Sequence, residues 1–120
     1  MAEIFTAFYQ YQIGLNLFHF QTNSYAGHKT SDMHLTRFRE HFDMFLEVFQ
    51  GIFGKINMTK SHRIEFGNLS KTSQIIKETQ KLNEFLEILS GQLSKYGDLV
   101  NIIDEIIADN HQFLYLLTFD

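Results

Sequence analysis

The sequence predicts an all-α protein, a single four-helix bundle in one domain spanning residues 1–120. Three observations lead to this class. Apolar residues recur at three- and four-residue spacing through nearly the whole chain, and no segment shows the alternation typical of a strand. The chain contains no proline, so few helix breaks are forced. Its 120 residues, of which 44% are hydrophobic, are enough for one core but too few for two domains.

The first helix is expected from about Glu3 to Thr22, ending in a cluster of helix-breaking residues at 23–27. Its buried face should consist of Ile4, Phe8, Tyr11, Leu15 and Phe18. The second helix is expected from His28 to Phe53. Its apolar stripe should consist of Leu35, Phe38, Phe42, Phe45, Phe49 and Phe53.

The third helix is expected from about Lys71 to Ser94, with Ser70 or Thr72 as its N-terminal cap. Its buried positions should be Ile75, Leu82, Leu86, Leu89 and Leu93. The fourth helix is expected from about Asp98 to Thr118. Its apolar positions are Leu99, Ile102, Ile103, Ile106, Ile107, Phe113, Leu114 and Leu117.

The connection at residues 55–70 is much longer than the other two, which are short turns that predict antiparallel hairpins. A helix of about 26 residues is roughly 39 Å long at ~1.5 Å per residue. About 16 residues of extended chain, at ~3.3 Å each, can span that length. The second and third helices can therefore run parallel, as in the one-crossover topology of ferritin-like folds.

Composition excludes several classes of function. The absence of cysteine excludes disulfides, thiolate metal sites and thiol nucleophiles. The net charge is −4 and there is no basic tail, which disfavours direct nucleic-acid binding. The first residues do not have the pattern of a signal peptide, and no apolar run is long enough to span a bilayer. We therefore expect a cytoplasmic protein that does not engage a membrane.

Four potential metal ligands lie on one strip of the second predicted helix. They have the spacing His-x3-Asp-x10-Asp-x3-Glu and are His28, Asp32, Asp43 and Glu47. At about 100° per residue, each close pair spans about 40°, and the step from Asp32 to Asp43 returns within about 20° of the starting direction. The strip borders the phenylalanine stripe, where charge is unusual.

One chain cannot bring both pairs to one metal ion, because eleven residues of helix separate them by roughly 16 Å. Ligand atoms must lie within about 2–2.5 Å of an ion. An antiparallel copy of the helix across a two-fold axis would place Asp43 and Glu47 of one subunit over His28 and Asp32 of the other, giving two equivalent sites. We therefore expect a homo-oligomer with a two-fold interface on the second helix. The mixed histidine and carboxylate ligands suit iron, manganese or zinc.

His19 is a fifth candidate ligand. It lies near the buried face of the first predicted helix, nine residues before His28. A helical hairpin would return His19 to the start of the second helix. The alternative is a hydrogen-bonded core histidine.

The run Leu17-Phe18-His19-Phe20, the spacing from His28 to Glu47 and the following Gly51 resemble the signature of the Dps-like mini-ferritins, a branch of the ferritin superfamily. Residues 98–119 resemble the last helix of that family in their apolar pattern. Short ferritin-like proteins of phages and large DNA viruses are similar as well. If the protein is viral, it would be located in the host cytoplasm or the virion.

This resemblance implies a ferroxidase centre between two-fold-related subunits. One subunit would supply His19, His28 and Asp32, and its partner would supply Asp43 and Glu47. The implied activity is the oxidation of Fe(II) by dioxygen or peroxide.

Alternatives remain for both the strip and the function. The strip could be a solvated helix border with intrahelical pairs to Lys29, Arg37 and Arg39. The protein could be a non-catalytic structural or interaction component of a virion or phage, with a relic metal site or none, so its status as an enzyme stays open. His34 and His41 are expected to be structural. A solvated face is expected for Asp104, Glu105 and Asp109.

Overall fold

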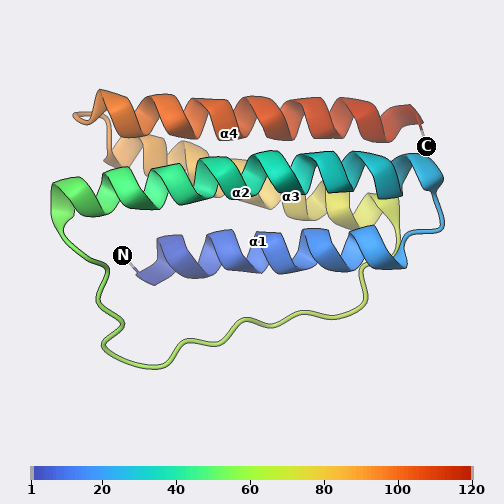
Figure 1. Ribbon diagram of the computed structural model, residues 1–120, viewed down its shortest axis with the longest axis horizontal. Coiled ribbons are helices and arrows are strands. Elements are labelled where there is room, and N and C mark those ends of the chain that lie inside the picture. Colours follow the sequence, from blue (N-terminus) through green and yellow to red (C-terminus); the bar gives the residue numbers. More distant parts are fainter. Residues whose placement is uncertain (1, 120) are drawn as a thin grey trace.

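The computed structural model describes residues 2–119 and shows four helices followed by a short 3-10 turn (Figure 1). They are α1 (Ala2–Gln21), α2 (Tyr25–Phe53), α3 (Thr72–Gln92), α4 (Gly97–Leu116) and η1 (Leu117–Phe119). α1 and α2 form an antiparallel hairpin, as do α3 and α4 (Figure 1). Residues 54–71 run the length of the bundle, so α2 and α3 are parallel (Figure 1). The predicted four-helix bundle with one long crossover is confirmed.

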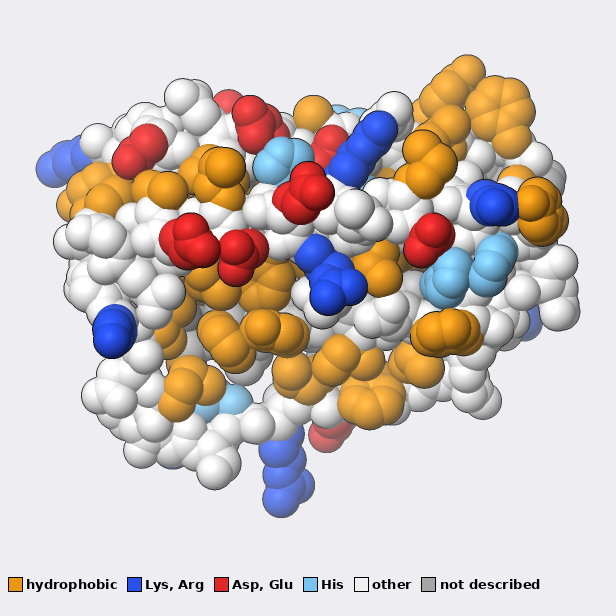
Figure 2. Space-filling model, viewed as in Figure 1, with side chains coloured by type: hydrophobic (Ala, Val, Ile, Leu, Met, Phe, Trp, Pro, Cys, Tyr) orange, Lys and Arg blue, Asp and Glu red, His pale blue; other side chains and the backbone are white. Residues whose placement is uncertain are grey.

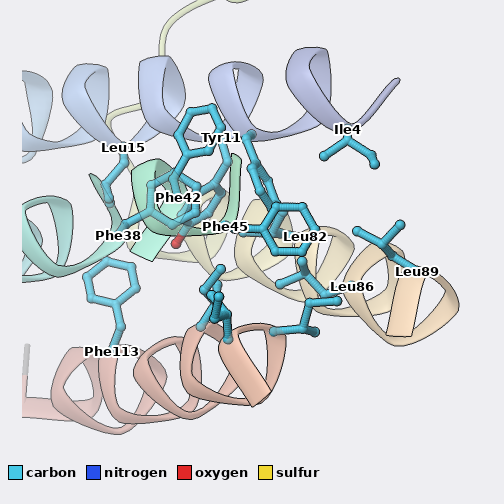
Figure 3. Close-up of a cluster of buried hydrophobic side chains, with 14 of the residues drawn as sticks. Ile4, Tyr11, Leu15, Phe38, Phe42, Phe45, Leu82, Leu86, Leu89 and Phe113 are labelled. Atoms are coloured by element: carbon cyan, nitrogen blue, oxygen red, sulfur yellow. The ribbon is translucent and has the colours of Figure 1, made fainter. Parts of the chain in front are cut away.

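The four helices enclose one core, because α1 and α4 each pack against both α2 and α3. Side chains from all four helices converge in this core (Figure 3). The buried positions predicted for the first and third helices are all buried. On α2 the exception is Phe53, in the last turn, whose side chain is 40% exposed.

Aromatic contacts join the α1–α2 hairpin. The ring of Phe8 meets Phe42 edge to face, with centroids 4.6 Å apart, and it also contacts Phe38 and Phe45. Such pairs contribute about 0.5–1.5 kcal/mol each beyond the area they bury. The phenylalanine stripe of α2 is therefore core, as its spacing predicts.

α2 begins at Tyr25, three residues before the predicted start at His28. The Ser24 side chain caps the helix by accepting a hydrogen bond from the backbone N–H of Gly27 at 2.9 Å. Gly27 is buried in the first turn, where a Cβ atom would lie 3.2 Å from the Phe18 ring and 3.2 Å from the Thr22 hydroxyl. The sequence pattern predicts that Gly27 breaks the helix, but Gly27 is a point of close packing inside α2.

The crossover is attached to α1 by specific contacts. Gln21 accepts a hydrogen bond from the backbone N–H of Leu69 at 2.6 Å and donates one to Asn68 at 3.1 Å. At the end of the crossover, Lys71 takes the cap position of α3, and the predicted caps, Ser70 and Thr72, flank it. The Gln74 side chain accepts from the backbone N–H of Lys71 at 3.0 Å.

Across residues 2–119, no helix combines the length and the apolar character needed to cross a membrane.

Candidate metal centre

The turn between α1 and α2 brings His19 and His28 together. Their rings stack with centroids 4.0 Å apart and 17° between the planes. His19 Nδ1 lies 2.9 Å from the backbone oxygen of His28, and His28 Nδ1 lies 2.8 Å from the backbone oxygen of His19. The expected return of His19 to the start of the second helix is confirmed, whereas its role as a ligand stays a prediction.

These reciprocal contacts determine where each ring carries its hydrogen. A carbonyl oxygen only accepts, so each Nδ1 must be the donor, and in the neutral ring Nε2 keeps its lone pair. Buried Ser31 supports this arrangement by donating to the backbone oxygen of His28 at 3.0 Å. Metal-binding histidines are commonly oriented in this way, with one nitrogen bonded to a carbonyl and the other left for the ion. The histidine pair therefore has the hydrogen-bonding state that a metal site requires.

Asp32 lies one helical turn beyond His28 and is exposed. The intrahelical ion pairs that would explain the strip without a metal are not formed among residues 2–119, where no basic side chain is within 4.0 Å of Asp32, Asp43 or Glu47. Lys29 lies over the Tyr25 ring, and Arg37 donates to Gln112. Lys29 and Arg37 therefore make other contacts.

Asp43 and Glu47 form the second half of the strip, and both are exposed on α2. Within the described residues 2–119, no three His, Asp or Glu side chains gather closely enough to hold a metal ion. Figure 2 shows why: two adjacent histidines lie toward one end of this face and a pair of acidic side chains lies toward the other. A single chain therefore brings together the two histidines. It does not bring together the two halves of the strip, as their helical spacing predicts.

Hydrophobic side chains lie next to this strip, over α1 (Figure 2). A groove of about 410 Å³ runs between α1 and α2, and Tyr9, Arg39, Asp43 and Leu46 are among its lining residues. α1 therefore has apolar residues on its outer surface as well as on its core face. The outward-facing positions, all partly or fully exposed, are Phe5, Tyr9, Ile13, Leu17 and Phe20.

A second cluster of ionisable groups, missed in the sequence, joins α2 to α4. His41 Nδ1 lies 2.8 Å from a carboxylate oxygen of Asp109, and His41 Nε2 lies 3.1 Å from one of Glu105. The expected solvated face holds for Asp104 and Glu105, which are exposed, whereas Asp109 is only 19% exposed and lies against His41. The two ring nitrogens lie close to separate carboxylates, and we call this arrangement the His41 clamp. Acidic residues four apart on α4, opposite a histidine on an antiparallel helix, are the signal that could have revealed it.

His34 is buried, as expected for a structural histidine, and its ring stacks on Phe113 with centroids 4.3 Å apart. Burial lowers the pKa of His34 to about 4, and the nearby charge of Arg37 acts in the same direction. The neighbouring Asn110 side chain opposes this effect on the pKa. His34 is therefore neutral in the folded protein at neutral pH.

Comparisons with known proteins place the chain in a family. No curated protein and no solved structure matches it. The model of a family of unknown function, DUF5856, matches residues 19–117, a range that includes all five candidate ligands. Because this match covers most of the chain, the protein belongs to the DUF5856 family.

Proposed function

We propose that two copies of the chain associate through the α1–α2 face and form two equivalent sites that bind and oxidise Fe(II). In each site, His19, His28 and Asp32 of one subunit would lie opposite Asp43 and Glu47 of the other. The observation that carries the proposal is the histidine pair, whose Nδ1 atoms are both bonded to backbone oxygens beside a carboxylate that has no cationic partner among residues 2–119.

The surface around the strip supports association with a second copy. A helix that is apolar on all sides is usually buried, and α1 has an outer row of apolar residues next to the strip. A two-fold axis near the middle of α2 would bury this row against its own copy. It would also bring the unpaired carboxylates of one subunit to the histidines of the other.

The ligand types suit this chemistry. Imidazole nitrogen and carboxylate oxygen both bind Fe(II), and the hard, anionic carboxylates favour Fe(III) once an electron has left. Iron is the substrate, and dioxygen or hydrogen peroxide accepts the electrons. Mn(II) and Zn(II) would compete for the same ligands, and redox-inert Zn(II) would bind without turnover.

The first test is an anaerobic Fe(II) titration of the purified protein, followed by admission of oxygen. Saturable binding and oxidation above a protein-free control are expected, and Asp32→Ala or Glu47→Ala should each abolish the excess rate. Asp104→Ala, which removes an exposed carboxylate on α4, is the matched control and should keep the wild-type rate. Equal rates in the wild type and Glu47→Ala would contradict the proposal.

Mixing two inactive variants tests whether the site lies between subunits. In a dimer of one Asp32→Ala chain and one Glu47→Ala chain, one site carries both changes and the other has no change. Random pairing makes half of the dimers mixed, so about a quarter of the wild-type sites should be restored. Each variant alone should remain inactive. No recovery on mixing would argue for a non-catalytic bundle, with the α1–α2 face serving only for association.

A further inference from the structure

One end of the bundle contains an open, mostly apolar cavity, separate from the candidate metal centre. Here α1 begins, α2 ends and the chain turns from α3 into α4 (Figure 1). The cavity has a volume of about 520 Å³. It is far from the histidine pair, because the roughly 25 residues of helix between His28 and the last residue of α2 span about 37 Å. Its apolar walls include Ile4, Phe49, Phe53, Phe85, Leu89 and Tyr96.

The apolar stripe of α2 continues one turn beyond the part that the other helices cover. Phe49 is 2% exposed, whereas Phe53, one turn later in the same stripe, is 40% exposed. The Phe53 ring packs against Phe49 with centroids 4.7 Å apart and meets Tyr96 edge to face at 4.9 Å. Ile88 of α3 also lines the cavity and is 65% exposed. Large apolar side chains exposed around a concave surface are typical of a ligand-binding site.

The crossover does not fill this cavity. Gly54 ends α2 with a φ of 89°, a conformation that favours glycine, and the chain leaves the helix direction there. The backbone N–H of Ile56 then donates to the side chain of Gln50 at 3.1 Å. The chain continues past α1 (Figure 1), and residues 54–71 contribute nothing to the lining. The cavity is therefore open to a molecule from outside the chain.

The charges around the cavity favour an uncharged ligand. Among the described residues that line it, Glu3 is the one charged side chain, and it is exposed. None of them is a lysine, an arginine or a histidine. An anion would lose hydration without gaining a cationic partner, and the Glu3 carboxylate would repel it. A cation would also lose hydration against apolar walls, and water screens its attraction to an exposed carboxylate.

The walls favour a flat ring. Four of the lining side chains are aromatic, and they are Phe49, Phe53, Phe85 and Tyr96. Aromatic rings attract one another in edge-to-face and offset stacked arrangements, beyond the area that they bury. The Gln92 side chain adds an exposed amide, which can donate or accept a hydrogen bond. Small-molecule sites commonly have volumes of about 300–1,000 Å³ and occur between the helices of bundles, so the cavity is large enough.

We propose that this cavity binds a small uncharged molecule that carries an aromatic ring system. The rings lie among the phenylalanine side chains and cover Phe53 and Ile88, and a polar substituent faces Gln92. This site is independent of the proposed iron chemistry, because none of the five candidate metal ligands lines the cavity.

Two dyes with the same rings test the class of ligand. N-phenyl-1-naphthylamine is uncharged, and 8-anilino-1-naphthalenesulfonate adds one sulfonate to the same framework. Both fluoresce more strongly in apolar surroundings, so titration of the full chain with a metal chelator present gives each dissociation constant. We expect saturable binding of one uncharged dye per chain and at least tenfold weaker binding of the sulfonate. No saturable binding of the uncharged dye, or equal affinity for both dyes, would overturn the proposal.

A matched pair of variants locates the site. Ile88→Asp places a charge on an exposed lining residue and should weaken binding of the uncharged dye at least tenfold, with the urea midpoint close to that of the wild type. Phe20→Asp places the same charge on the outer row of α1 and should leave the affinity within twofold. A loss in Phe20→Asp as large as that in Ile88→Asp would place the dye on α1 and overturn the proposal.

NMR spectroscopy locates the dye without any variant. Nuclear Overhauser effects should connect the protons of the uncharged dye to the methyl groups of Ile4, Ile88 and Leu89, which line the cavity. Effects confined to methyl groups elsewhere in the chain would overturn the proposal. Because the chelated protein is used, these results do not depend on whether the chain oxidises iron.

Discussion

The two sides of α2 differ in whether their charged side chains have partners within the chain. On the side facing α4, His41 lies between two carboxylates and Arg37 donates to Gln112, so the chain supplies its own partners. On the side next to α1, Asp32, Asp43 and Glu47 have no basic side chain within 4.0 Å among residues 2–119. The α2–α4 side therefore holds the chain together, whereas the α1–α2 side leaves the three candidate carboxylate ligands exposed beside the outer apolar residues of α1.

A matched pair of phenylalanine substitutions should show the largest difference in the free energy of unfolding between the two sides. Phe113 on α4 is 1% exposed and stacks on His34, whereas Phe20 on α1 is 77% exposed. We expect Phe113→Ala to lower the free energy of unfolding by about 3–5 kcal/mol because it leaves a cavity. Phe20→Ala should change it by no more than about 0.5 kcal/mol. Urea unfolding of the two variants measures both values, and similar losses would contradict the comparison.

Low pH should destabilise the folded protein, because His34 is buried against α4. Its pKa is about 4 in the folded protein and 6.5 in the unfolded chain, so between these values the unfolded chain binds the extra proton. The free energy of unfolding should therefore fall as the pH is lowered from about 6.5 to 4, by an amount on the order of 3 kcal/mol.

Urea unfolding at several pH values measures this loss. His34→Gln should flatten the profile across that range, because it removes the titrating group. His111→Gln, at an exposed position on α4, is the control and should leave the slope as in the wild type. A wild-type slope in His34→Gln would assign the pH dependence to other groups.

On the α1–α2 side, a charge placed on the outer row of α1 should act on association and not on folding. We expect Phe20→Asp to weaken self-association at least tenfold, which corresponds to about 1.4 kcal/mol. Its urea midpoint should stay close to that of Phe20→Ala. Sedimentation equilibrium of the two variants and the wild type provides the measurement, and an unchanged dissociation constant would place the interface elsewhere.

The His41 clamp should give the smallest effects. Glu105 is 61% exposed, so Glu105→Gln should cost only a few tenths of a kcal/mol. The Asp109 side chain is 19% exposed, and Asp109→Asn should cost about 1 kcal/mol. Both variants should oxidise Fe(II) at the wild-type rate, because the clamp faces away from the α1–α2 side. A loss of oxidation in either variant would break the distinction between the two sides.

Periodicity was enough to predict the bundle, its crossover and most of the core, because burial of one face determines where apolar residues recur. The predicted start of α2 is wrong by three residues. The sequence does not distinguish a glycine that breaks a helix from one, such as Gly27, that allows a close contact inside it. The His19–His28 pair followed from the hairpin, but its reciprocal hydrogen bonds depend on the exact angle of the turn. The His41 clamp joins residues far apart in sequence, so the spacing of Glu105 and Asp109 reveals it only once α2 and α4 are known to be neighbours.

Gly27 has a consequence for how the histidine pair can vary. It sits directly before His28, and its missing side chain lets the Phe18 ring, directly before His19, approach the backbone of α2. The contact between Gly27 and Phe18 therefore sets the distance between the two histidines that follow them in sequence. Because a Cβ at position 27 would lie 3.2 Å from that ring, even alanine would require the ring to shift by a few tenths of an ångström. Selection for the pair would therefore act on a residue that can neither bind a metal nor donate a side-chain hydrogen bond.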